Sequence, residues 1–180
     1  MLIEKRVIKK ANIYPAVKAI YKEAFPKKER FLFAFFENRA SNGKADFYSY
    51  WFEDILVGFT YVLKSENYVY VFYLAVKKEE RGKGYGSEIL NLVKEKYKDK
   101  VVSLAIEPLD INANNYNQRV KRKLFYQKNG FTSQIERMEY AGEKYEIMSY
   151  NGVVTDYAYN TLLKSWLGSF LFPFFKVKIR

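Results

Sequence analysis

The chain has 180 residues, 49% of them hydrophobic and 19% aromatic, which is enough for one well-packed domain and short for two. It contains no cysteine and no histidine, so disulfides, thiolate metal sites, cysteine nucleophiles and a histidine general base are excluded, and we expect no metal site. A formal net charge of +11 favours an anionic partner, although lysines that only solvate helix faces explain it equally well. The N-terminal stretch MLIEKRVIKK lacks the apolar run of a secretory signal, so we expect a cytoplasmic location.

The first half of the chain alternates between apolar patterns of helical type and of strand type. Apolar residues at helical spacing precede Pro26, and a second apolar-rich helix ends at the SNGK turn. Runs of β-branched and aromatic residues, separated by short turns, then predict three consecutive antiparallel strands. These elements are expected at residues 3–10 (strand), 12–25 and 28–40 (helices), and 46–52, 55–64 and 68–76 (strands).

The second half continues with helices and strands after the segment RGKGYG, residues 81–86, where Ile89, Leu90 and Val93 return to helical spacing. The later elements are expected at residues 101–107 (strand), 114–128 (helix), 131–140 and 144–150 (a hairpin around AGE) and 155–169 (helix). The predicted fold class is therefore mixed α/β (α+β): a mostly antiparallel central sheet of about seven strands, flanked by about four helices, plus a C-terminal helix and an aromatic tail. We expect a single domain over residues 1–180.

The segment RGKGYG connects a predicted strand to a predicted helix. A helix N-terminus presents unpaired backbone amides and partial positive charge, and glycines let an anion approach the backbone closely. The dinucleotide pattern GxGxxG fails because Ser87 replaces its third glycine, and the Walker pattern GxxxxGK[ST] is absent. What remains is RxxGxG, formed by Arg81, Gly84 and Gly86, with a plain strand-to-helix turn as the alternative.

Two segments carry a family resemblance. LAVKKEERGKGYGSEIL resembles the acyl-CoA pyrophosphate motif of the GNAT superfamily of N-acetyltransferases, and LFYQKNGF, about forty residues later, resembles that family's second signature. The resemblance implies an enzyme that moves an acetyl group from acetyl-CoA to a primary amine by direct attack in a ternary complex. The rival interpretation is a non-catalytic module on the same scaffold, which binds RNA or an anionic membrane through its basic face.

The resemblance also implies where acetyl-CoA binds. The amides of the glycine loop would hold its pyrophosphate, and the strand before the loop would pair with the pantetheine arm. By position, the Leu74 amide would face the thioester carbonyl as an oxyanion donor, and Val76 would bond pantetheine. The implied cofactor-binding residues are Leu74, Val76, Arg81, Gly82, Lys83, Gly84, Tyr85, Gly86 and Ser87.

Two residues are candidates for proton transfer. Tyr126 stands where many GNAT enzymes keep the tyrosine that protonates the leaving thiolate, although packing is the ordinary role of a tyrosine. The predicted fourth strand lacks the carboxylate that many relatives use as a base. Glu107, at the end of the fifth strand, is the candidate base, with a strand-end salt bridge as the equal alternative. Asn115 is a candidate cap for the helix that follows.

The chain after residue 155 departs from the minimal family pattern. Its uncharged stretch, residues 165–175, is too short to span a bilayer. Three alternatives remain: the stretch folds back on the domain, packs against a second subunit or rests on a membrane surface. We favour the first two. The expected partners are acetyl-CoA and a small-molecule or peptide amine, with a homodimer as one outcome and no specific nucleic acid. The sequence names neither the acceptor nor the oligomeric state.

Overall fold

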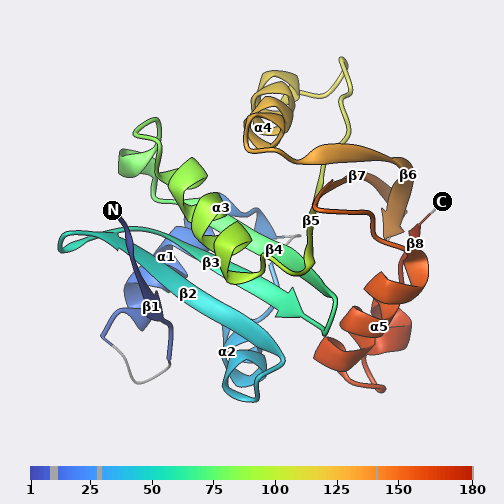
Figure 1. Cartoon of the computed structure of the whole chain (residues 1–180), viewed down its shortest axis with the longest axis horizontal. Coiled ribbons are helices and arrows are strands. Elements are labelled where there is room, and N and C mark those ends of the chain that lie inside the picture. The colour runs from blue at the N-terminus through green and yellow to red at the C-terminus, as the bar shows by residue number, and fades with distance from the viewer. Residues whose placement is uncertain (9–11, 28–29, 141, 180) are drawn as a thin grey trace. The chain divides into compact units, whose positions relative to one another are not determined.

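The computed structural model describes residues 1–8, 12–27, 30–140 and 142–179, which form two compact units (Figure 1). The first unit is Met1–Lys64 with Val71–Lys96, and the second is Ser65–Tyr70 with Tyr97–Arg180. Parts of three predicted elements, at residues 9–10, 28–29 and 141, lie outside the described residues. The single domain expected from the sequence stays a prediction.

The first unit contains the elements that lead up to the glycine loop and the helix after it. They are β1 (Ile3–Arg6), α1 (Tyr14–Ala24), α2 (Phe33–Ser41), β2 (Ala45–Phe52), β3 (Ile55–Lys64), most of β4 (Tyr68–Val76), a 3-10 helix (Lys78–Glu80) and α3 (Tyr85–Lys96). β2 and β3 pair in antiparallel order, as predicted. α2 begins later than predicted, at Phe33, because Leu32 keeps an extended backbone with φ −61° and ψ 124°.

Successive residues of β2 face opposite sides of the sheet, and each side packs against helices of the first unit. The Phe47 ring lies 5.7 Å from that of Phe33 in α2, whereas Tyr50 is buried in a cluster with Ile89 of α3. Figure 1 shows α3 on one side of β2 and β3, with α1 and α2 on the other. This packing on both faces fixes the end of β4 and the start of α3, where the glycine loop lies.

The second unit contains the remaining strands and helices. They are the start of β4, β5 (Val101–Ile106), α4 (Tyr116–Lys128), β6 (Thr132–Tyr140), β7 (Glu143–Tyr150), α5 (Asp156–Leu167), α6 (Phe172–Phe175) and β8 (Lys178–Ile179). β6 and β7 form the predicted antiparallel hairpin. α5 begins where the sequence predicts it, because the Thr155 side chain accepts a hydrogen bond from the Ala158 amide and caps the helix.

The strands form one sheet in the order β1-β2-β3-β4-β5-β7-β6-β8. β4 and β5 run parallel, whereas β1-β2, β2-β3, β5-β7, β6-β7 and β6-β8 are antiparallel. The mixed, mostly antiparallel α/β fold expected from the sequence is therefore confirmed, with β8 as a strand that the sequence did not predict. In the part of the chain that the structure describes, no helix combines the length and the apolarity needed to cross a membrane.

The tail of the second unit folds back along α5. The Asn160 side chain, 9% exposed, donates to the Val177 carbonyl at 2.9 Å and accepts from the Val177 amide at 3.1 Å. The Asp156 carboxylate accepts from the Ile179 amide at 2.9 Å. Folding back, one of the alternatives left open by the sequence, is thus confirmed for the residues that these bonds hold.

Candidate functional site

The loop from β4 to α3 has a backbone that glycine adopts most easily. After the 3-10 helix, Arg81 is extended, and Gly82 and Gly84 have φ of 80° and 89°, in the left-handed region that a side chain opposes. Gly86 lies outside that region, because it already belongs to the first turn of α3. The backbone conformation of the turn therefore accounts for two of the three glycines, Gly82 and Gly84.

Most backbone amides of this loop are unpaired in the described part of the chain. Within the described residues, the backbone amides of residues 82–86 donate no hydrogen bond. Ser87 differs, because its amide donates to the Gly84 carbonyl at 3.0 Å. A Cβ placed on Gly82 or Gly84 would meet nothing within 4 Å. Unpaired amides at a helix N-terminus, reinforced by the helix dipole, favour a bound anion.

Charged side chains around the loop add positive potential and are partly paired. Lys83 donates to Glu80 at 2.9 Å, and that hydrogen bond raises the pKa of Lys83 above its ordinary value. Arg81 donates from Nε to the Val76 carbonyl at 3.1 Å, and its side chain is otherwise exposed. Both cations lie at the surface beside the open amides, where they attract an anion.

A glycine in β3 lets β4 come close to it. A Cβ on Gly58 would lie 2.4 Å from the Ala75 carbonyl oxygen, a distance that Cβ atoms do not reach without displacing the backbone. The register of β2 and β3 shifts beside Gly58, as at a β-bulge. The bare backbone of Gly58 therefore sets where Ala75 lies, between the two residues of β4 expected to contact pantetheine.

The end of β4 and the start of α3 are packed against each other. The side chains of Leu74, Val76 and Tyr85 are half-buried against the cluster that contains Tyr50 and Ile89. The strand end, the loop and the first turn of α3 thus belong to one packed body. All nine predicted cofactor-binding residues lie in this segment of the first unit.

Glu107 follows β5 in the second unit and is held by side chains of α4 and of Asn115, the residue before α4. Arg122 lies 2.6 Å from its carboxylate, Asn115 donates to both oxygens at 3.2 and 3.3 Å, and Arg119 lies at 3.3 Å. Burial by itself raises the pKa of Glu107, but the hydrogen bonds from Arg122 and Asn115 and the arginine charges outweigh it and hold that pKa below its ordinary value. A carboxylate with a lowered pKa is a weak proton acceptor. This geometry favours the salt-bridge alternative, and Glu107 as a base stays a prediction.

Tyr126 lies near the end of α4, in the second unit. Its ring contacts those of Phe125 and Phe131, with centroids 5.1 and 5.8 Å away. Burial raises the pKa of the Tyr126 hydroxyl to about 12, although the charge of Arg122 acts in the opposite direction. The hydroxyl makes no hydrogen bond to any residue that the structure describes. A protonated phenol without a partner is free to donate a hydrogen bond to a ligand.

The motif LFYQKNGF also ends α4. Asn129 donates from its side chain to the Phe125 carbonyl at 2.7 Å, and Gly130 has φ of 86°. The Phe131 amide then donates to the Tyr126 carbonyl at 3.1 Å, and the Phe131 ring is buried. The second half of this motif is therefore a helix stop that orients Tyr126.

Two charged residues of the second unit escaped the sequence analysis, Arg122 and Glu146. Glu146 of β7 is 2% exposed, accepts a hydrogen bond from Ser133, and lies 2.7 Å from Lys123 and 3.4 Å from Arg137. Burial raises the pKa of Glu146, but the bonds from Lys123 and Ser133 lower it by more. No local pattern signals this group, because its partners come from α4 and β6.

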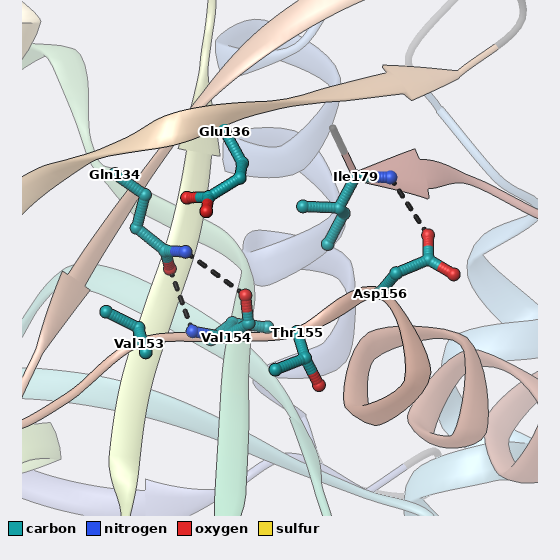
Figure 2. Close-up of a pocket in the computed structure, with 7 residues that line it drawn as sticks. All are labelled: Gln134, Glu136, Val153, Val154, Thr155, Asp156 and Ile179. Atoms are coloured by element: carbon teal, nitrogen blue, oxygen red, sulfur yellow. Dashed lines mark hydrogen bonds between the residues drawn. The ribbon is translucent and has the colours of Figure 1, made fainter.

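The pocket in Figure 2, about 260 Å³, contains none of the predicted site residues. It is lined by Gln134, Glu136, Val153, Val154, Thr155, Asp156 and Ile179. The side chain of Gln134 donates to the Val154 carbonyl at 3.1 Å and accepts from the Val154 amide at 2.9 Å, so it joins β6 to the segment before α5. We interpret the residues around this pocket as packing contacts between β6 and the segment before α5.

The strand, the glycine loop with unpaired amides and the helix after it lie on a mixed, mostly antiparallel sheet, in an arrangement that favours a phosphate-bearing ligand. Residues 43–133, just over half of the chain, match the acetyltransferase (GNAT) domain, so the chain belongs to the GNAT family of acetyltransferases. The resemblance inferred from the two motifs is confirmed. A comparison with curated proteins found no match.

Solved structures share the fold at low sequence identity. A putative GNAT-family acetyltransferase from Bacteroides thetaiotaomicron is 19% identical, with a TM-score of 0.73 over 89% of this chain and 93% of that one. A Bacillus subtilis acetyltransferase in complex with CoA is 16% identical, with a TM-score of 0.60 over 85% and 100%. The ribosomal-protein-S18-alanine N-acetyltransferase of Escherichia coli is 15% identical, with a TM-score of 0.62 over 83% and 92%. These likenesses concern the fold alone.

Proposed function

We propose that this chain transfers an acetyl group from acetyl-CoA to a primary amine by direct attack in a ternary complex. The observation that carries the proposal is the set of open amides at residues 82–86, because the pyrophosphate of CoA is an anion of the kind that such amides accept. Arg81 and Lys83 supply exposed positive charge beside them. The residues present therefore fit acetyl-CoA, with its pantetheine arm along Leu74 and Val76.

The remaining steps of the proposed reaction are assigned to Leu74, Tyr126 and Glu107. The Leu74 amide is proposed to stabilise negative charge on the acetyl oxygen, and the Tyr126 hydroxyl to donate to the departing sulfur. A raised pKa keeps the Tyr126 proton in place at neutral pH. The attacking amine must be neutral, and Glu107 stays the predicted base, although its lowered pKa counts against that role. A cytoplasmic location and a homodimer also stay predictions.

Cofactor binding is tested by thermal unfolding with and without CoA. CoA at about 100 times its dissociation constant should stabilise the fold by about 2.7 kcal/mol. Gly86→Glu should abolish that stabilisation, because a side chain and a negative charge both oppose phosphate there. Asn91→Glu is the matched control, since it adds the same charge at an exposed position of the same helix and should leave the shift intact.

Catalysis is tested separately, by thiol release from acetyl-CoA with a panel of amines that includes peptides, polyamines and aminoglycosides. Release that depends on both substrates supports the proposal. Stabilisation by CoA with no release for any amine would instead support the non-catalytic module. Absence of any CoA effect on a folded wild-type protein would refute the site itself.

A further inference from the structure

The segment after α5 exposes aromatic rings that the folded-back tail leaves uncovered. Phe170 is 85% exposed and Phe174 is 77% exposed, while Leu171 and Phe172 between them are half-buried. Residues 170–174 thus form a small apolar surface, called here the 170–174 surface. The chain on either side of it is fixed, because Trp166 and Val177 are almost fully buried. The exposed rings therefore belong to a segment that is held at both ends, and they form a small apolar surface that a partner can cover.

The charged residues nearest to the 170–174 surface along the chain are lysines. Lys164 and Lys176 lie on either side of it and are exposed, and Lys178, also exposed, follows in β8 opposite Glu139 of β6. Asp156 is the one acidic residue between residues 156 and 179, and its carboxylate already accepts the Ile179 amide. Phenylalanines beside lysines complement a surface that is apolar inside and anionic outside.

We infer that the 170–174 surface docks on an anionic lipid bilayer. A second copy of the chain fits this surface less well, because it would bring a net charge of +11 against the same lysines. Single-stranded RNA also stacks on aromatic rings, but Leu171 and Pro173 offer no stacking face. Insertion of Phe170 and Phe174 below the headgroups, with the lysines among the lipid phosphates and carboxylates, uses every part of the surface.

The attachment expected from this surface is peripheral and reversible. Two phenylalanines bury little area compared with a lipid chain, so the lysines have to contribute, and each lysine near an anionic surface strengthens binding roughly fivefold. Binding should therefore need anionic lipid and weaken at high salt. It is independent of the proposed transferase activity, which lies with β4, the glycine loop and α4.

The test is co-sedimentation of the full chain with vesicles of phosphatidylcholine alone and with vesicles of phosphatidylcholine and phosphatidylserine in equal amounts. We expect sedimentation with the mixed vesicles at low salt, loss of most of it at high salt, and little with phosphatidylcholine alone. The double variant Phe170→Ser, Phe174→Ser should lose binding at least tenfold. Ile111→Ser is the matched control, because Ile111 is 79% exposed on the loop before α4 and should leave binding unchanged.

A second double variant, Lys164→Gln with Lys176→Gln, keeps the rings and should weaken binding roughly 25-fold if both lysines meet the headgroups. Circular dichroism confirms that each variant is folded. Failure of the wild type to sediment with mixed vesicles overturns the inference, as does sedimentation that the phenylalanine variant retains. A wild-type dimer that the phenylalanine variant makes monomeric, or RNA binding that it abolishes, with no vesicle binding in either case, overturns it in favour of that other partner.

Discussion

Replacing Tyr126 by phenylalanine removes only the hydroxyl oxygen and so distinguishes a catalytic role of this residue from a packing role. Tyr126→Phe keeps the ring contacts with Phe125 and Phe131, and the hydroxyl bonds to no described residue, so stability and CoA affinity should change little. If the hydroxyl donates to the departing sulfur, kcat should fall about 100-fold. Because the pKa of Tyr126 is raised to about 12, wild-type activity should show no loss from its deprotonation up to about pH 10.

Steady-state kinetics across pH, with an accepted amine, measure both effects. Tyr116→Phe is the matched control, since it removes a hydroxyl at the other end of the same helix and should leave kcat unchanged. A kcat for Tyr126→Phe within twofold of wild type at every pH would make Tyr126 a packing residue.

A substitution at Glu107 tests whether this residue acts as the catalytic base or only forms a salt bridge. Its folded-state pKa lies below its ordinary value of 4.5, so the carboxylate stabilises the fold above about that pH and loses this contribution as pH falls through the lowered pKa. Glu107→Gln should therefore cost about 1 kcal/mol at neutral pH, with the difference from wild type shrinking toward zero in acid. Urea unfolding at a series of pH values measures this difference in the free energy of unfolding. Unchanged stability with kcat reduced 100-fold would instead identify Glu107 as the base.

At this scale the sequence predicted site residues where a motif contained them and, for Glu107, where a predicted strand ends. Tyr126 and the glycines stand in two motifs with a fixed spacing, and their roles stay predictions. Arg122 and Glu146 stand in no motif, because their roles depend on partners from other elements. Their charges looked like those of solvated positions until the pairing of α4 with β5 and β7 placed them. The pairing of Lys83 with Glu80 was likewise not predicted, although the two are three residues apart.

At the scale of elements, the approach of β3 to β4 sets the position of the strand expected to hold pantetheine. Gly58→Ala would place a Cβ 2.4 Å from the Ala75 carbonyl oxygen, so the backbone of β4 must shift. We expect the Michaelis constant for acetyl-CoA to rise about tenfold and stability to fall by about 1 to 3 kcal/mol. Gly43→Ala is the matched control.

Gly43 lies in the same unit with φ of 70°, and a Cβ there would meet nothing within 4 Å. Gly43→Ala should therefore cost stability through backbone strain, by about 1 kcal/mol, without changing CoA affinity. Calorimetric titration with CoA and acetyl-CoA kinetics separate the two variants. If Gly58→Ala binds CoA as tightly as Gly43→Ala does, β3 does not position the cofactor strand.

Sequence periodicity predicts an element but not the contacts between elements. Most strands and helices with several turns or pleats appeared at the expected places, since period 2 and period 3.6 are visible over that length, but β1 ends at Arg6 and not at residue 10. β8 was missed, because two residues show no period, and the start of α2 was set too early, because FLFAFF is apolar throughout. The bulge beside Gly58 was missed as well, since it arises from strand pairing.

At the scale of the whole molecule, the two proposals assign part of the net charge of +11 to anionic partners. Several cations are already paired within the chain, among them Lys64 with Asp46, Arg122 with Glu107 and Lys123 with Glu146. Exposed cations remain at the glycine loop and around the 170–174 surface, where the proposed partners are CoA and anionic lipid. Both partners should bind more weakly as salt rises, but only lipid binding should depend on the tail.

Two deletions test how the tail is held to the rest of the second unit. Removing residues 176–180 takes away Val177 and β8, and leaves the buried Asn160 amide without the two bonds that it makes there. The deletion removes two hydrogen bonds, worth about 1 kcal/mol each, and the buried Val177 side chain, so the midpoint of thermal unfolding should fall clearly. Removing residues 169–180 should lower the midpoint further, because Leu171, Phe172 and Phe175 are half-buried, whereas Phe170 and Phe174 are mostly exposed and contribute little.

Thermal and urea unfolding give the stability of both deletions, and light scattering gives their mass in solution. The variant Phe170→Ser, Phe174→Ser is the control, since it should unfold with wild-type stability while it loses the apolar surface. A wild-type midpoint for the short deletion would show that Asn160 does not anchor the tail. If deleting residues 169–180 halves the mass in solution and deleting residues 176–180 does not, residues 169–175 hold two subunits together. The shorter deletion retains those residues and removes only the segment that Asn160 binds.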